Sequence, residues 1–149
     1  MDSSALVKRY VEENGSAWIQ ALTEPNARHK LIIARIAWVE ILSAFARRQR
    51  EGTFAPADAA KALQSFRFDL DHQYQVVEVD RSLIEAAGQL VGKHPLRAYD
   101  AVQLASILRI LPAFAQAKTV SLTFVSADDR LIAAAQVEGL NTEHPNQHL

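Results

Sequence analysis

The chain has 149 residues, 49% hydrophobic and 22% charged, which suits one domain over residues 1–149 with a substantial core and excludes disordered and collagen-like classes. Its formal net charge of −1 argues against a protein that grips nucleic acid by overall basicity, so any such contact must come from a local patch. The absence of cysteine excludes disulfides, thiolate zinc sites and cysteine nucleophiles, and it fits a reducing cytoplasm, where we expect the protein to be located.

In the first half of the chain, apolar residues at helical spacing predict helices over residues 5–12, 16–23 and 37–50, and from Pro56 towards Asp71. Ser3 or Ser4 is the expected N-cap of the first helix, and Ser16 that of the second. The branched apolar run at residues 31–34 is predicted to be a buried strand, and residues 74–79 a second strand.

In the second half, Asp80 is expected to cap a helix over residues 82–93, and a helix opened by Asp100 is expected to end near Leu111 and Pro112. A strand at 122–125, a helix at 130–137 and a short strand at 141–143, within a polar tail of residues 140–149, complete the prediction. Strands that alternate with helices predict an α/β domain with a central, mainly parallel sheet flanked by helices. No apolar run approaches about 20 residues and no signal-peptide pattern begins the sequence, so we expect no membrane span.

The helix that begins near Asp100 is almost wholly apolar in its next turns. A helix that is apolar on most sides belongs in the interior, where carboxylates are rare. Capping of the helix and interaction with its dipole would explain a single acid here. Three further acids in comparable places, Asp2, Glu40 and Asp128, indicate that more than capping is involved.

These four acids are expected to converge at one edge of the sheet. In parallel α/β sheets, ligands bind beyond the carboxyl ends of the strands, where strands give way to helices. Asp128 lies between a predicted strand and a helix, Asp2 precedes a helix, Asp100 opens a buried one, and Glu40 lies one turn into its own.

Convergence would be unfavourable without a counter-ion. Two like charges about 4 Å apart repel by about 1 kcal/mol in water and about 4 kcal/mol near a protein surface. Either the acids are dispersed, or one stays protonated, or a divalent cation lies among them. Oxygen ligands without cysteine or suitably spaced histidine favour Mg²⁺ or Mn²⁺ over zinc. Carboxylates that hold such an ion suit attack by water on a phosphodiester.

Four segments carry a resemblance to a known family: residues 2–8, 38–41, 96–105 and 124–128. In order and spacing they resemble the PIN-domain ribonucleases, more narrowly the VapC-like toxins of bacterial toxin–antitoxin pairs. The resemblance implies a three-layer PIN-like domain in which Asp2, Glu40, Asp100 and Asp128 are catalytic and bind Mg²⁺ or Mn²⁺, with Ser4 and Ser126 beside them. It also implies endonucleolytic hydrolysis of RNA, a homodimer and a cognate antitoxin as partner.

The sequence departs from this family at its start, because only Met1 precedes Asp2 where relatives have several strand residues. A mis-assigned start codon or a trimmed sequence would explain the difference. Three site assignments have alternatives or secondary status: Asp129 could replace Asp128 as ligand, Ser4 and Ser126 could be simple caps, and Arg97 is the better candidate for contact with RNA. The alternative function is a catalytically inactive PIN-like binding module.

Overall fold

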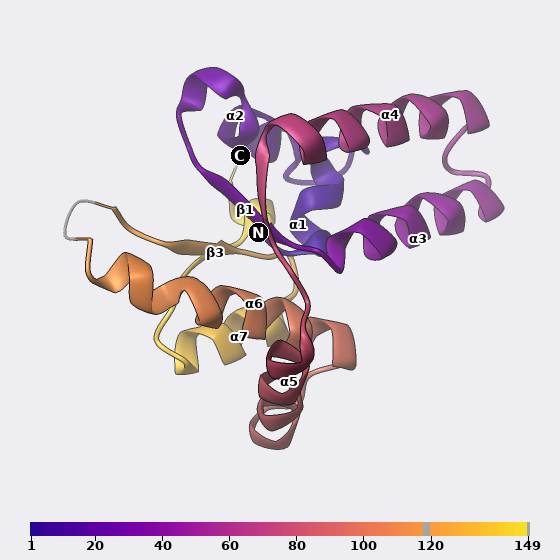
Figure 1. Cartoon of the computed structure of the whole chain (residues 1–149). Helices are drawn as coiled ribbons and strands as arrows, with labels where there is room; N and C mark the ends of the chain where they lie inside the picture. The colour runs from indigo at the N-terminus through magenta and orange to yellow at the C-terminus, as the bar shows by residue number, and fades with distance from the viewer. Residues whose placement is uncertain (118–119, 149) are drawn as a thin grey trace.

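The computed structural model describes residues 1–117 and 120–148, so the last residue of the predicted polar tail, Leu149, lies outside the described residues. The chain forms an α/β fold that is rich in helix, as predicted (Figure 1). The α-helices are α1 (Ser3–Leu6), α2 (Ser16–Thr23), α3 (Ala37–Arg50), α4 (Pro56–His72), α5 (Arg81–Lys93), α6 (Ala98–Ala115) and α7 (Asp129–Val137). The strands are β1 (Leu31–Ala34), β2 (Tyr74–Val77), β3 (Thr123–Val125) and β4 (Asn141–Glu143), and short 3-10 helices span Val7–Arg9, Pro25–Ala27 and Pro145–Gln147.

The strands pair in parallel, but they do not form the single central sheet that the sequence predicted. β1 pairs with β2, with Leu31 opposite Tyr74, and β3 pairs with β4, with Thr123 opposite Asn141. Within the described residues, Met1 and Asp2 connect the two sheets through the backbone: the Met1 amine donates to the Ile32 carbonyl at 2.9 Å, and the Asp2 N–H donates to the Val125 carbonyl at 3.0 Å. The three-layer arrangement around one sheet is therefore not observed.

A cavity of about 610 Å³ lies where the sheet is divided. Its walls come from β1, β3 and α6, and Met1 is part of the lining. Because two residues cannot hydrogen-bond along the whole length of two strands, the facing edges of β1 and β3 stay apart. Asp2 is bonded to Val125 at the carboxyl end of β3, and Met1 is bonded to Ile32 within β1.

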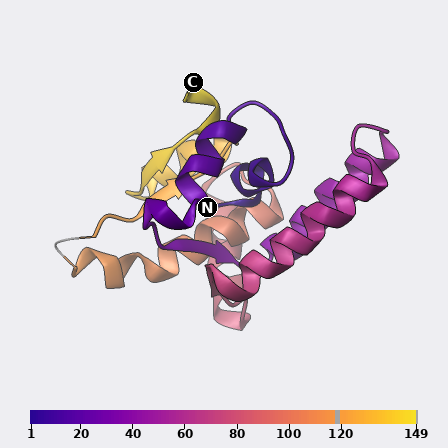
Figure 2. The ribbon, with the colours of Figure 1, turned by 90° about the horizontal axis from the view of Figure 1, so that it is seen from above.

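Two large hydrophobic cores flank the division, and a smaller cluster of Ala5, Ile19 and Val125 packs with Met1. One joins β3 and helices α5, α6 and α7, and the other joins β1, β2, α3 and α4. The paired helices α3 and α4 project from the rest of the molecule (Figure 2). Within the described residues, no helix combines the length and apolarity needed to cross a membrane. The first turns of α3, α6 and α7 meet near the boundary between the cores, which is where the candidate site lies.

Several helix ends differ from the prediction. Asp2, rather than Ser3 or Ser4, caps α1, since its carboxylate accepts from the Ala5 N–H. Gly15, in a left-handed conformation with φ 85°, precedes α2, so Ser16 is the first helical residue instead of the cap. Helix α6 continues through Pro112 to Ala115, because the residues around Pro112 are largely exposed and water can solvate the carbonyl that loses its donor.

Candidate functional site

Asp2 is a buried carboxylate held by its own helix terminus. Only 4% of the residue is exposed. One carboxylate oxygen accepts from the Ala5 N–H at 3.2 Å, and the Ser4 hydroxyl lies 2.9 Å from each carboxylate oxygen. Burial raises the pKa of the Asp2 carboxyl, although the hydrogen bond from Ser4 opposes this shift. Hydrogen bonds therefore fix the Asp2 side chain in place, but they do not fully compensate for the burial of its negative charge.

Two serine hydroxyls connect Asp2 to the start of α7. The Ser4 Oγ accepts from the Ala127 N–H at 2.8 Å and lies 3.4 Å from the Ser126 Oγ. Ser126 Oγ in turn accepts from the Asp128 N–H at 3.1 Å. Neither serine caps a helix, so in this structure both hydroxyls instead tie the loop after β3 to the start of α1.

Asp128 caps α7, because its Oδ1 accepts from the Arg130 and Leu131 N–H groups at 2.9 and 3.1 Å. Its Oδ2 accepts from the Arg97 guanidinium at 3.0 Å. Asp129 behaves differently: 92% of its side chain is exposed, and its carboxylate lies 3.5 Å from His144. Of the two neighbouring acids, Asp128 is the one that is connected to the other candidate residues.

Glu40 lies in the first turn of α3 and reaches α6 through an amide that sequence reasoning missed. Gln103 Nε2 donates to Glu40 Oε1 at 2.8 Å and to the Ser3 Oγ at 3.0 Å. Gln103 is 3% exposed within α6, where the buried residues around it are mostly apolar. A buried amide requires hydrogen-bond partners, so a glutamine in such a helix was the signal that could have identified this contact.

Negative charge accumulates around Glu40. Burial raises the pKa of its carboxyl, the hydrogen bond from Gln103 opposes this shift, and the charges of Asp2 and Asp100 raise it further. These two acids therefore lie close enough to Glu40 to act on it electrostatically.

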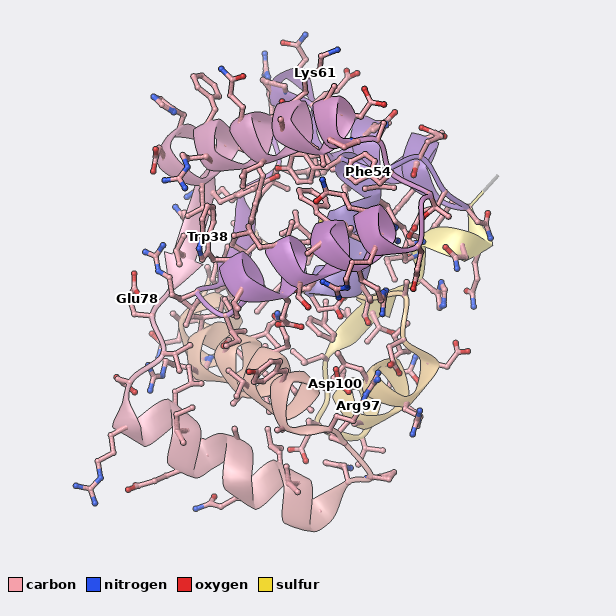
Figure 3. All side chains as sticks on the ribbon, turned by 90° about the vertical axis from the view of Figure 1, so that its right-hand side faces the viewer. Trp38, Phe54, Lys61, Glu78, Arg97 and Asp100 are labelled. Carbon is pink, nitrogen blue, oxygen red and sulfur yellow. The ribbon has the colours of Figure 1, made fainter. Side chains whose placement is uncertain are left out.

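Arg97 joins the remaining two acids. Asp100 is the third residue of α6 rather than its cap, and its Oδ2 accepts from Arg97 Nε at 3.0 Å. The same guanidinium donates from Nη2 to Asp128, and the hydrogen bond to Asp100 is the main reason that the pKa of Arg97 is raised. Arg97 and Asp100 lie side by side below α3 in Figure 3.

All four predicted acids thus belong to one neighbourhood, but intervening side chains keep them apart. Among residues 1–117 and 120–148, no group of three or more acidic, histidine or cysteine side chains has a metal-holding arrangement. The donors are nevertheless all oxygens, and the Arg97 guanidinium pairs with two of the four carboxylates, Asp100 and Asp128. Burial is the main reason that the pKa values of Asp2 and Glu40 are raised, so both carboxylates are poorly solvated in their charged form. This donor set fits Mg²⁺ or Mn²⁺ if Arg97 gives way.

Comparison with known proteins gives two similar sequences from Mycobacterium tuberculosis and no matching protein-family model. Ribonuclease VapC45, from strain CDC 1551, and ribonuclease VapC49, from strain H37Rv, are each 31% identical to this chain over 109 residues. The matched region covers 73% of this chain and 74% of each relative.

Proposed function

Because the chain belongs to the VapC ribonuclease family, we propose that it is a metal-dependent endoribonuclease, the toxin of a toxin–antitoxin pair, that hydrolyses RNA phosphodiesters. The names of the two relatives support ribonuclease activity. The choice of residues rests on the arrangement of the four acids.

The observation that carries the proposal is a continuous chain of contacts between acids that are distant in sequence. Asp2 is connected through Ser4 and Ser126 to Asp128, and Asp128 is connected through Arg97 to Asp100. Glu40 joins this group through Gln103 and through the electrostatic effect of Asp2 and Asp100. Carboxylates gathered in this way are typical of sites that hold a divalent cation.

In this mechanism Asp2, Glu40, Asp100 and Asp128 would hold Mg²⁺ or Mn²⁺. When bound, the ion would polarise the phosphate and lower the pKa of its bound water. Ser4 and Gln103 orient the carboxylates of Asp2 and Glu40, and the capping bonds of Asp128 fix the third carboxylate. This orientation reduces the reorganisation needed when the charged phosphate enters the site.

The variant Asp100→Asn tests the proposal. We expect it to fold like the unmodified protein, since asparagine has nearly the same shape, and to lose Mn²⁺-dependent RNA cleavage by about a hundredfold or more, because one charged ligand is removed. Circular dichroism and cleavage of a labelled RNA measure the two quantities. Asp58→Asn is the control, because Asp58 is likewise an acid in the first turn of a helix but is exposed and lies outside the candidate site. Undiminished cleavage by Asp100→Asn would refute the assignment.

A catalytically inactive binding module is the second candidate function. The divided sheet and the separation of the acids by Arg97 and Gln103 favour it. A ligand that binds only the folded state must stabilise that state. A melting temperature that stays unchanged in Mg²⁺ and in Mn²⁺, together with absent RNA cleavage, would support this second function.

The proposed partners besides RNA are a cognate antitoxin and a second copy of this chain. Exposed large apolar side chains offer surface for such contacts; they include Phe68 on α4, Ile84 and Val91 on α5, and Val137 on α7.

A further inference from the structure

Arg97 is exposed, yet both of its ion-pair partners are largely covered. About 70% of its side chain is accessible to solvent, against 19% for Asp100 and 20% for Asp128. The guanidinium lies over the two carboxylates from the solvent side and bonds the Oδ2 of each at 3.0 Å. It is the cation that balances these two acids in this structure.

Little free energy is needed to break the ion pairs of Arg97 with Asp100 and Asp128. An exposed ion pair contributes little to stability, since water solvates the guanidinium almost as well when the pair is broken. A divalent cation that used Asp100 and Asp128 would lie close to the guanidinium and repel it. Arg97 and the cation therefore compete for the same carboxylates.

We infer that Arg97 is a displaceable internal cation. It neutralises Asp100 and Asp128 when no divalent ion is bound, leaves them when an ion binds, and then contacts a phosphate of the RNA with its freed guanidinium. A guanidinium binds phosphate with several N–H donors in a plane, which suits it to this second role. The inference rests on the proposed function, because it requires a divalent ion at these acids.

Calorimetric titration with Mn²⁺ in the absence of RNA tests the competition. We expect Arg97→Ala to bind Mn²⁺ about threefold to tenfold more tightly than the unmodified protein, because the ion no longer has to break an ion pair of modest strength. Arg81→Ala is the matched control, since Arg81 forms an exposed ion pair with Glu85 within α5, and its Mn²⁺ affinity should stay unchanged. Affinity of Arg97→Ala equal to or weaker than that of the unmodified protein overturns the inference.

Thermal unfolding gives a readout that is independent of cleavage. In EDTA, Arg97→Ala should melt about 2–4 °C lower, because Asp100 and Asp128 lose their counter-ion. In saturating Mn²⁺ this deficit should disappear or reverse. If the melting temperature of Arg97→Ala is lower by the same amount in EDTA and in Mn²⁺, Arg97 stays paired with Asp100 and Asp128 when the ion binds. That result would overturn the inference that the ion displaces Arg97.

The salt dependence of cleavage tests the contact with phosphate. A lost contact to single-stranded RNA should reduce the slope of log kcat/KM against log salt concentration by about 0.7. We expect this reduction in Arg97→Ala and an unchanged slope in Arg81→Ala. An unchanged slope in both variants would overturn the transfer of Arg97 to the phosphate.

The same titrations separate this inference from the proposed function. If the unmodified protein binds Mn²⁺ but Arg97→Ala binds it no more tightly, only the inference about Arg97 fails. If no variant and not even the unmodified protein binds Mn²⁺, both fail together.

Discussion

Glu40 and Asp2 are carboxylates that the fold holds in an environment unfavourable for their charge. Each has a raised pKa, with burial as the largest cause, and neither forms an ion pair with a lysine or arginine side chain within the described residues. Retaining such groups lowers the stability of the protein at neutral pH. Sites of this kind occur where function requires a charge that folding alone would not favour.

Replacement of Glu40 by glutamine should therefore stabilise the metal-free protein at neutral pH. Because the folded-state pKa of Glu40 is raised, the folded chain binds its proton more tightly than the unfolded chain. Its contribution to the free energy of unfolding thus falls as pH rises from the ordinary value of a glutamate through the raised one, and stays low above it. In EDTA at pH 7 we expect Glu40→Gln to be more stable by about 0.5–2 kcal/mol, measured by urea unfolding.

The gain should shrink at pH 4, below the ordinary pKa of a glutamate, where Glu40 of the unmodified protein is mostly protonated in both its folded and its unfolded state. Glu85→Gln on α5 is the control, because Glu85 is exposed and belongs only to the pair with Arg81. A gain in Glu40→Gln that is the same at both pH values would contradict this explanation.

At the level of single residues, the sequence predicted that these four acids lie near one another, but it did not predict the side chains that they contact. Asp2, Glu40, Asp100 and Asp128 could be selected because their positions at element boundaries are a local property of the chain. The bond from Gln103 to Glu40 joins residues 63 positions apart, and Arg97 reaches Asp128 across 31 positions. Such pairings depend on how the helices pack, which periodicity does not specify.

Among the elements, the helices with clear apolar periodicity were predicted best. The range of α3, residues 37–50, is the predicted one, and Asp80 caps α5 as expected. The prediction was wrong at helix ends whose position depends on contacts with other parts of the fold. Asp2 takes the cap of α1 because its backbone is fixed by Val125, and α6 passes Pro112 because that turn faces solvent.

The turn before α2 provides a prediction at this scale. Gly15 has φ 85°, and a Cβ on it would lie 2.8 Å from backbone atoms of Pro145. We expect Gly15→Ala to lose about 1–2 kcal/mol from the left-handed backbone and about 1–3 kcal/mol more from the clash, measured by urea unfolding. Gly139 has the same φ with no atom within 4 Å of its Cβ position, so Gly139→Ala should show only the first loss. Equal losses in the two variants would mean that the 3-10 helix at Pro145–Gln147 does not pack against this turn.

In the whole molecule, the sequence predicted an α/β chain with parallel strand pairs, but it could not predict the division of the sheet. Parallel pairing follows from alternation of strands and helices, which is visible in sequence. Whether β1 and β3 share one sheet depends on what lies between them, and here Met1 and Asp2 form one hydrogen bond to each side. The division places Glu40 on the core of α3 and α4, whereas Asp100 and Asp128 belong to helices of the other core.

A divalent ion held by all four acids would therefore connect the two cores, and its effect should reach both. At about one hundred times its dissociation constant, an ion that binds only the folded state adds about 2.7 kcal/mol to the free energy of unfolding. We expect Mn²⁺ to slow amide hydrogen exchange in the first turns of α3, α6 and α7 together, because all three carry a proposed ligand or its cap. The first turn of α5, capped by Asp80 outside the site, is the internal control and should change least. Asp100→Asn should abolish the protection in all three helices. Protection confined to α6 and α7 would mean that Glu40 does not bind the ion and that the site belongs to one core alone.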